Sequence, residues 1–221
     1  MGKDKLKRFA ENESFACLIQ PKFTYPLPDH PLKGNWRKDF FHNGNPVVLE
    51  LGCGRGEYTT ELAARYPGKN FIGIDWKGAR LWRGAKTAHE EKTPNVGFLR
   101  ILMQNMAAYF AVGEVDEIWI TFPVPHMETI SERKRVTSPR FLNLYRSISK
   151  RDAVIHLKTD SRSLYDYTLE VLSNEKIVPI TSTNDLYGGS HDDVLSIKTT
   201  YEKMWLKDGA KICYVKFNLN T

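Results

Sequence analysis

The feature that most constrains this chain is a pair of short apolar segments, each followed at once by a turn. Val47–Leu51 leads into Gly52-Cys53-Gly54-Arg55-Gly56, and Phe71–Ile74 is followed by Asp75. Continuous apolar runs of this length are typical of strands that are buried on both faces of a parallel sheet. Because glycine permits positive φ angles and close backbone approach, the sequence predicts a ligand-binding turn at the carboxyl edge of that sheet.

The spacing of the glycines indicates which ligand this turn accepts. A dinucleotide-binding fingerprint runs Gly-x-Gly-x-x-Gly, whereas here the third glycine comes one residue early. Glu50 would repel a pyrophosphate but suits the cationic methionyl end of S-adenosylmethionine, and Asp75 is placed to accept hydrogen bonds from ribose hydroxyls. A nicotinamide dehydrogenase is therefore disfavoured, and a glycine turn without a ligand is the structural alternative. The arrangement resembles the class I S-adenosylmethionine-dependent methyltransferases.

Length and composition favour one globular catalytic domain. The chain has 221 residues, of which 41% are apolar, and no apolar run approaches the length that spans a bilayer. The three cysteines are far apart in the sequence and lack the spacing of metal ligands. We therefore expect a protein of the reducing cytoplasm that binds neither a membrane nor a metal.

The net charge of +6 favours a polyanionic partner, since Lys and Arg near phosphates release counterions. Basic residues gather in the first dozen positions, between Lys33 and Lys38 around Trp36, and at Arg133-Lys134-Arg135 with Arg140. Basic residues beside aromatics can hold phosphates and stack on bases. A solvated surface is the alternative explanation for each cluster.

After residue 46, strands and helices alternate, which predicts an α/β fold with a parallel sheet covered on both faces. The resemblance implies the Rossmann-like class I methyltransferase type, a doubly wound, seven-stranded, mostly parallel sheet with an antiparallel last strand. Before it, four prolines and no sustained period predict an extended, basic arm over residues 1–45, with the methyltransferase domain covering 46–221. We expect strands near 47–51, 71–75, 96–101, 116–121, 153–158, 177–182 and 211–217. We expect helices near 57–66, 77–91, 103–110, 138–149 and 161–174.

A second group of reactive side chains follows two later strands. Ile118–Thr121 leads into the proline-containing turn Phe122–His126, and Ile155–Leu157 leads into Lys158-Thr159-Asp160. Since the carboxyl ends of parallel strands meet at one edge, we expect these residues to face the same crevice as the glycine turn.

At this point the resemblance narrows to the bacterial tRNA (guanine-N7)-methyltransferases and covers about residues 45 to 217. It implies an enzyme that transfers a methyl group from S-adenosylmethionine to N7 of a guanine in tRNA, with the oligomeric state, monomer or homodimer, left open. The residues that carry it are Leu49–Gly54, Ile74-Asp75, Phe122-Pro123 with Pro125, His156–Asp160, Thr199–Glu202 and the final strand Ile212 to Phe217.

The resemblance also implies which residues bind cofactor and substrate. Glu50 and Asp75, with Gly52 and Gly54 of the turn, match the family's cofactor site, and a third cofactor contact falls at Gln104 or Asn105. The implied substrate-binding residues are Lys158, Asp160, Thr199, Tyr201 and Glu202. Among these, Asp160 and Glu202 could accept hydrogen bonds from the N1 and exocyclic amine of guanine.

One turn departs from the family pattern Phe-Pro-Asp-Pro-Trp-Pro-Lys-Lys. Val124 stands where the family has an acid, and Glu128 where it has a lysine, so no catalytic residue is assigned. The alternative function is therefore a cofactor- or RNA-binding relative whose methyltransferase activity is lost or altered.

Several site residues also have a purely structural interpretation. Asp160 could cap the helix that follows it, and Glu202 could be a surface residue. His156 is expected to be a buried, hydrogen-bonded histidine, and Trp119 a core residue.

Overall fold

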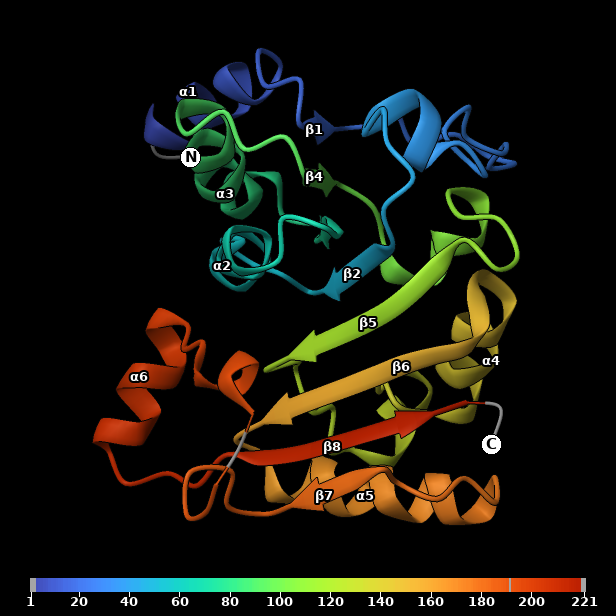
Figure 1. Ribbon diagram of the computed structural model, residues 1–221, viewed down its shortest axis with the longest axis vertical. Coiled ribbons are helices and arrows are strands. Elements are labelled where there is room, and N and C mark those ends of the chain that lie inside the picture. Colours follow the sequence, from blue (N-terminus) through green and yellow to red (C-terminus); the bar gives the residue numbers. More distant parts are fainter. Residues whose placement is uncertain (1–2, 191, 220–221) are drawn as a thin grey trace. The chain divides into compact units, whose positions relative to one another are not determined.

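The computed structural model describes residues 3–190 and 192–219 and divides into two compact units, residues 1–111 and 112–221. Each unit has its own strands with helices packed against them (Figure 1). Eight strands lie within the described residues. None of the described helices is both long enough and apolar enough to cross a membrane.

The first unit is a parallel sheet with its helices in the crossovers. Its strand order is β1-β4-β3-β2, and each neighbouring pair is parallel. Helix α1 packs against α3, and α2 against α3 and β3. The strands are β1 (Leu18–Ile19), β2 (Val47–Leu51), β3 (Asn70–Ile74) and β4 (Val96–Leu99). The helices are α1 (Lys3–Asn12), a π-helix (Trp36–Phe40), α2 (Glu57–Arg65), α3 (Gly78–Glu90) and a 3-10 helix (Met103–Ala108).

Every residue of β2, β3 and β4 is buried, as their continuous apolar sequence predicts. The ring of Phe98 on β4 sets how closely the helices approach this sheet. A Cβ on Gly56, before α2, would lie 2.5 Å from that ring, and a Cβ on Gly84 of α3 would lie 2.6 Å from it. The third glycine of the turn therefore serves the packing of helix against strand.

The second unit mixes parallel and antiparallel pairing. Its order is β5-β6-β8-β7, with β5 parallel to β6 and β8 antiparallel to both of its neighbours. Helix α4 packs on β6, and α5 packs on β6 and β8 (Figure 1). The strands are β5 (Val115–Thr121), β6 (Ser149–Thr159), β7 (Thr181–Thr183) and β8 (Cys213–Asn218). The helices are a 3-10 helix (Thr129–Lys134), α4 (Pro139–Ile148), α5 (Arg162–Asn174), a 3-10 helix (Asp193–Ser196) and α6 (Thr200–Lys207).

The predicted fold class is confirmed: the protein is α/β with mostly parallel strands and an antiparallel last strand. All seven predicted strands are present, although the sixth, β7, begins four residues later than the predicted 177. The prediction missed α6 and the regular structure before residue 46. That segment, predicted to be an extended arm, contains α1, β1 and the π-helix, and β1 adds a strand beside β4. The domain boundary near residue 45 stays a prediction.

Candidate functional site

The glycine turn after β2 presents open backbone. Gly52 and Gly54 have φ angles of 71° and 57°, which side chains rarely adopt. A Cβ on Gly52 would meet nothing within 4 Å, and one on Gly54 would meet only the Gly52 carbonyl oxygen, at 3.9 Å. The turn is therefore glycine-rich for its backbone conformation and not because neighbouring atoms crowd it, so a ligand can approach this backbone closely.

Glu50 is a buried carboxylate one residue before the end of β2, with 3% of its surface exposed. It accepts a hydrogen bond from the hydroxyl of Thr59, a buried residue of α2. Burial raises the pKa of the neighbouring Cys53 thiol well above its ordinary value, and the negative charges of Glu50 and Asp75 raise it further. Cys53 therefore stays a neutral thiol between two acids, and the site favours a cation.

Asp75 joins the end of β3 to the glycine turn. One carboxylate oxygen accepts a hydrogen bond from the Gly54 amide at 3.0 Å, and the other accepts one from the Lys77 amide at 2.7 Å. These two bonds fix the orientation of the carboxylate. Each oxygen keeps a further lone pair, so Asp75 can still accept hydrogen bonds from a ligand.

Gln104 and Asn105 lie on the 3-10 helix that follows β4. Gln104 is exposed and Asn105 is half-buried, and neither side chain forms a hydrogen bond with another residue of the described ranges. Both amides thus remain available to a ligand, and the choice between them stays open.

In the second unit, the turn after β5 is held in an unusual conformation. Phe122 and His126, neither of them glycine, have φ angles of 50° and 46°. The Phe122 amide donates to the Lys158 carbonyl at 2.8 Å, and the buried Arg135 donates to the carbonyls of His126 at 3.0 Å and Met127 at 3.1 Å. Strained backbone that its surroundings hold in place is common at functional sites.

Arg135 is therefore a structural residue and not a free RNA contact. Its guanidinium also lies 4.2 Å from the centre of the Tyr167 ring. Val124 projects from the turn that Arg135 holds, with 67% of its surface exposed. The position where the family has an acid thus points to solvent in this unit.

Lys158 and Glu202 form a fully buried ion pair, with the ammonium 2.9 Å from a carboxylate oxygen. Lys158 also donates to the carbonyls of Ile197 at 3.0 Å and Leu195 at 3.4 Å, and Tyr187 donates its hydroxyl to Glu202. Burial lowers the pKa of Lys158, and the nearby Glu202 opposes that shift. This cluster, the Lys158–Glu202 network, ties the end of β6 to the segment before α6.

Thr199 begins α6 as its N-cap, because its hydroxyl accepts a hydrogen bond from the Glu202 amide at 3.2 Å. Tyr201 is half-exposed, and its ring stacks on Trp205 with 6.1 Å between centroids. Trp205 in turn lies 5.1 Å from Phe122 of the β5 turn. The segment Thr199–Glu202 therefore presents Tyr201 while its glutamate is enclosed.

Asp160 follows β6 directly and is exposed. It does not cap α5, since the cap is Ser161, whose hydroxyl accepts from the Leu164 amide at 3.2 Å. Its carboxylate forms no hydrogen bond with the rest of the described chain. The structural alternative for Asp160 is therefore wrong, and the side chain is available to a substrate.

His156 and Trp119 have the structural roles that the sequence predicts. The His156 ring stacks on Trp119 at 3.8 Å, lies 2.8 Å from the Tyr214 hydroxyl and is 3.3 Å from a Glu117 oxygen. Both residues are buried in the core of the second unit.

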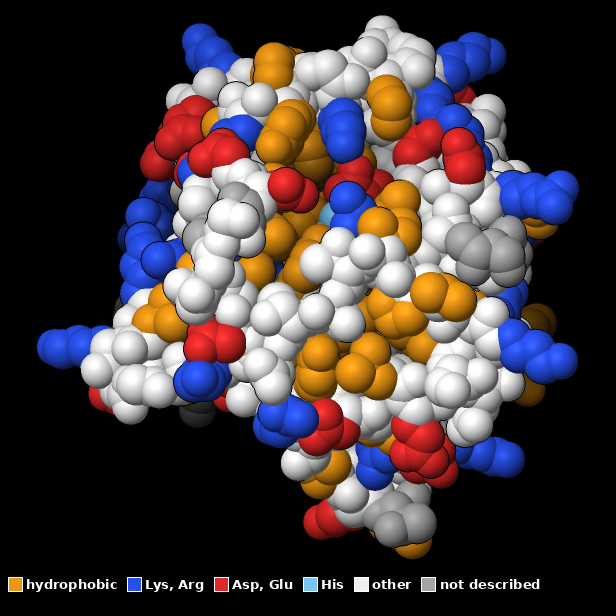
Figure 2. Space-filling model, turned by 60° about the horizontal axis from the view of Figure 1, so that its bottom comes forward, with side chains coloured by type: hydrophobic (Ala, Val, Ile, Leu, Met, Phe, Trp, Pro, Cys, Tyr) orange, Lys and Arg blue, Asp and Glu red, His pale blue; other side chains and the backbone are white. Residues whose placement is uncertain are grey.

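The basic clusters are less available for contacts with RNA than the sequence indicates. Trp36 is fully buried and donates its indole N–H to the Tyr109 carbonyl at 2.8 Å, so it cannot stack on a base. Lys33 pairs with Asp29 at 2.8 Å. Figure 2 shows Lys and Arg side chains beside Asp and Glu side chains on the face that it draws.

Two features of the second unit were not predicted from the sequence. Tyr187, a central member of the Lys158–Glu202 network, carries no motif that singles it out. The start of α6 does have a signal, since Thr199-Thr200-Tyr201-Glu202 matches the Thr-x-x-Glu pattern of a helix N-terminus. No group of His, Cys, Asp and Glu side chains that could hold a metal ion occurs in the part of the chain that the structure describes.

Comparison with known proteins shows the family of this chain. The profile described as "Putative methyltransferase" matches residues 44–215. A tRNA (guanine-N(7)-)-methyltransferase of Christiangramia forsetii is 47% identical over 99% of both chains, and one of Porphyromonas gingivalis is 51% identical over 93% of this chain and 82% of its own. The solved structure of an antibiotic-related methyltransferase, 18% identical, has the same fold with a TM-score of 0.63, covering 88% of this chain and 97% of its own. This chain belongs to the tRNA (guanine-N(7)-)-methyltransferase family.

Proposed function

We propose that this protein transfers the methyl group of S-adenosylmethionine to N7 of a guanine in tRNA. The observation that carries the proposal is the near full-length identity of 47% to a relative named for this reaction. The identity extends over 99% of both chains, so it includes the segments that carry the candidate sites and supports the proposal. We place the protein in the cytoplasm, with tRNA as its macromolecular partner.

The residues of the first unit fit the cofactor. The open backbone at Gly52 and Gly54 leaves space for a ligand, and the acids Glu50 and Asp75 suit a molecule with a cationic end and a ribose. Bound S-adenosylmethionine supplies an electrophilic methyl group on its sulfonium. Glu50 and the glycine turn would hold the methionyl end, Asp75 the ribose, and Gln104 or Asn105 the adenine edge.

The residues of the second unit would hold the guanine. Its N7 carries a free lone pair at neutral pH, so the chain needs no general base and contributes mainly by positioning the base for in-line attack. Asp160, with its free and exposed carboxylate, would accept hydrogen bonds from the N1 and exocyclic amine of guanine. Tyr201, in the Thr199–Glu202 segment, would offer its half-exposed ring to the base.

Glu202 and Lys158 act in this proposal as positioning residues. Each is fully buried and satisfied by the other and by neighbouring groups, so neither has a free edge for a base. Their pairing fixes the start of α6, and through it Thr199 and Tyr201.

Val124 is compatible with activity under this mechanism. Positive charge develops on the imidazole ring of guanine during transfer, and the family's acid would balance it. Without that acid the reaction is slower, but positioning and the intrinsic reactivity of N7 remain.

Transfer of a labelled methyl group to tRNA tests the proposed function. Incubating the protein with S-adenosylmethionine labelled on its methyl group and with tRNA that lacks N7-methylguanosine should label the tRNA. The same tRNA methylated beforehand at N7 is the control and should take up no label. Binding of S-adenosylhomocysteine without any transfer would contradict the proposal and favour a cofactor-binding relative that has lost its activity.

A further inference from the structure

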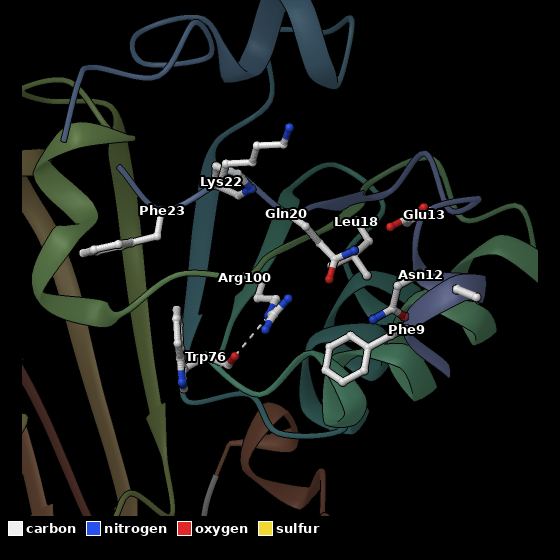
Figure 3. A pocket seen from close by; sticks show the side chains of 11 residues that line it. Phe9, Asn12, Glu13, Leu18, Gln20, Lys22, Phe23, Trp76 and Arg100 are labelled. Atoms are coloured by element: carbon white, nitrogen blue, oxygen red, sulfur yellow. Dashed lines mark hydrogen bonds between the residues drawn. The ribbon is translucent and has the colours of Figure 1, made fainter. Parts of the chain in front are cut away.

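The first unit contains a hollow of about 820 Å³ that lies outside the glycine turn (Figure 3). Its lining comes from α1, from the segment around β1, and from the residues that follow β3 and β4. Glu50, Gly52, Gly54 and Asp75 do not line it. Its lining includes Phe9, Asn12, Gln20, Phe23, Trp76 and Arg100.

Aromatic surface and a cation dominate this hollow. Trp76 and Phe23 expose 48% and 67% of their surfaces, far more than a packed aromatic residue does. The Arg100 guanidinium lies between Trp76 and Phe9, 5.6 Å and 5.1 Å from their ring centres, and donates to the Trp76 carbonyl at 3.3 Å (Figure 3). A half-exposed ring that a guanidinium holds in place is suited to stacking on a nucleobase.

Two hydrogen-bond acceptors in the lining lack donors. The Oδ1 atom of Asn12 and the Oε1 atom of Gln20 are buried and have no partner among the described residues. Asn12 is 1% exposed, and its amide nitrogen is fixed by the Gly78 carbonyl at 2.9 Å, so its oxygen cannot turn away. Buried acceptors without donors are costly, and an amino group, which carries two N–H donors, would satisfy both of them.

The charges of the lining fit the same kind of ligand. Lys22 and Arg100 outnumber Glu13 among the charged residues of the lining. Lys22 is exposed, so it can meet a phosphate at the edge of the hollow.

We infer that this hollow binds one unpaired, amine-bearing nucleotide of the RNA substrate, with its base on Trp76 and Phe23 and its exocyclic amine toward Gln20 and Asn12. This inference rests on the proposed function for the identity of the RNA. The lining residues up to Phe23 lie outside the stretch 44–215 that the family profile matches, so most of the lining is additional to the matched methyltransferase core.

The direct test measures binding of short unpaired RNA to the full-length protein with S-adenosylhomocysteine at saturation, so that the cofactor site is filled. Tetraadenylate, which carries amines, should bind about tenfold more tightly than tetrauridylate, which does not. Gln20→Leu should remove most of that preference, because it keeps the shape of the side chain and loses the acceptor. Phe23→Ala should weaken both oligonucleotides about fivefold.

A second arm uses tRNA that lacks N7-methylguanosine. The double variant Gln20→Leu/Phe23→Ala should bind this tRNA about fivefold more weakly, with unchanged affinity for S-adenosylhomocysteine. Val178→Ala, which truncates an exposed apolar side chain of the second unit, is the matched control and should bind tRNA as the wild type does.

Equal affinity of the wild type for the two oligonucleotides would overturn the inference. Loss of S-adenosylhomocysteine affinity in the double variant would also overturn it, because the hollow would then belong to the cofactor site. Tetraadenylate binding without methyl transfer to tRNA would refute the proposed function and leave the nucleotide site standing. Methyl transfer to tRNA without a preference for tetraadenylate would refute the nucleotide site and leave the proposed function standing.

Discussion

Glu50 and Glu202 are both buried carboxylates at the candidate sites, yet their surroundings differ. Glu50 lies beside a glycine turn whose backbone faces open space, whereas Glu202 is enclosed by a lysine, a tyrosine and its own helix. In the first unit, Glu50 thus lies where a ligand can approach. In the second unit, Glu202 instead holds the start of α6, which carries Thr199 and Tyr201. A buried acid at a family motif can therefore serve either binding or architecture, and only its hydrogen-bond partners distinguish the two.

The largest expected effect comes from breaking the Lys158–Glu202 network. Lys158→Met should destabilise the protein by about 3–5 kcal/mol, because it leaves a buried carboxylate without its cation. The double variant Lys158→Met/Glu202→Leu should be more stable than the single variant. Urea denaturation measures both, and Lys150→Met, which breaks the partly exposed pair with Asp116, is the control with an expected cost of about 1 kcal/mol or less. Additive losses in the double variant would show that the pair is not a unit.

Alanine substitutions in the glycine turn should distinguish a glycine needed for packing, Gly56, from one that leaves room for the ligand, Gly54. Gly56→Ala should cost about 2–4 kcal/mol of stability, because its Cβ meets the Phe98 ring at 2.5 Å and its φ is 72°. Gly54→Ala should cost only about 1–2 kcal/mol, since its surroundings are open, and should weaken S-adenosylhomocysteine binding. Thermal unfolding and calorimetric titration give the two readouts. Comparable stability losses in both variants would show that Gly54 is also a packing residue.

Asp75→Asn should weaken S-adenosylhomocysteine binding about tenfold, because an amide offers one acceptor oxygen where the carboxylate offers two. Its stability should change by about 1 kcal/mol, the value of a lost backbone hydrogen bond. The control is Asp152→Asn, an exposed aspartate of β6 that should leave affinity unchanged. An Asp75→Asn protein with wild-type affinity would remove Asp75 from the cofactor site.

Substitutions of the two residues that follow β6, Asp160 and Ser161, should have opposite effects on stability and activity. Ser161→Ala should lower stability by about 1 kcal/mol through loss of the α5 cap, with little change in kcat/KM. Asp160→Asn should lower kcat/KM for tRNA and leave the unfolding midpoint unchanged, because its carboxylate has no partner in the described chain. If Asp160→Asn unfolds more easily at unchanged kcat/KM, the substrate role is wrong.

Val124→Asp should give the smallest effect, a rise in transfer rate of about two- to fivefold, the size expected for a solvent-exposed charge interaction. The side chain is 67% exposed, so the substitution meets no steric barrier. Val124→Asn is the matched control, since it adds hydrogen-bonding capacity without charge. Single-turnover kinetics with tRNA measure both, and an unchanged or lower rate for Val124→Asp would show that this turn does not use an acid.

These contrasts also show what could be predicted from the sequence. The strands β2 and β3, the glycine turn and Asp75 follow from local apolar runs and spacing, so the sequence places them within one residue. The Lys158–Glu202 network joins residues 44 positions apart, and no local pattern encodes such a pair. The fully buried Trp36 likewise depends on its tertiary bond to Tyr109, so its basic neighbours misleadingly suggested an RNA contact.

The identity of the product tests the account most directly. Transfer RNA that lacks N7-methylguanosine is incubated with this protein and S-adenosylmethionine, digested to nucleosides and analysed by mass spectrometry against authentic standards. We expect 7-methylguanosine as the one new nucleoside. Its absence, or a methyl group on another atom of guanosine or on another base, would contradict the proposed function.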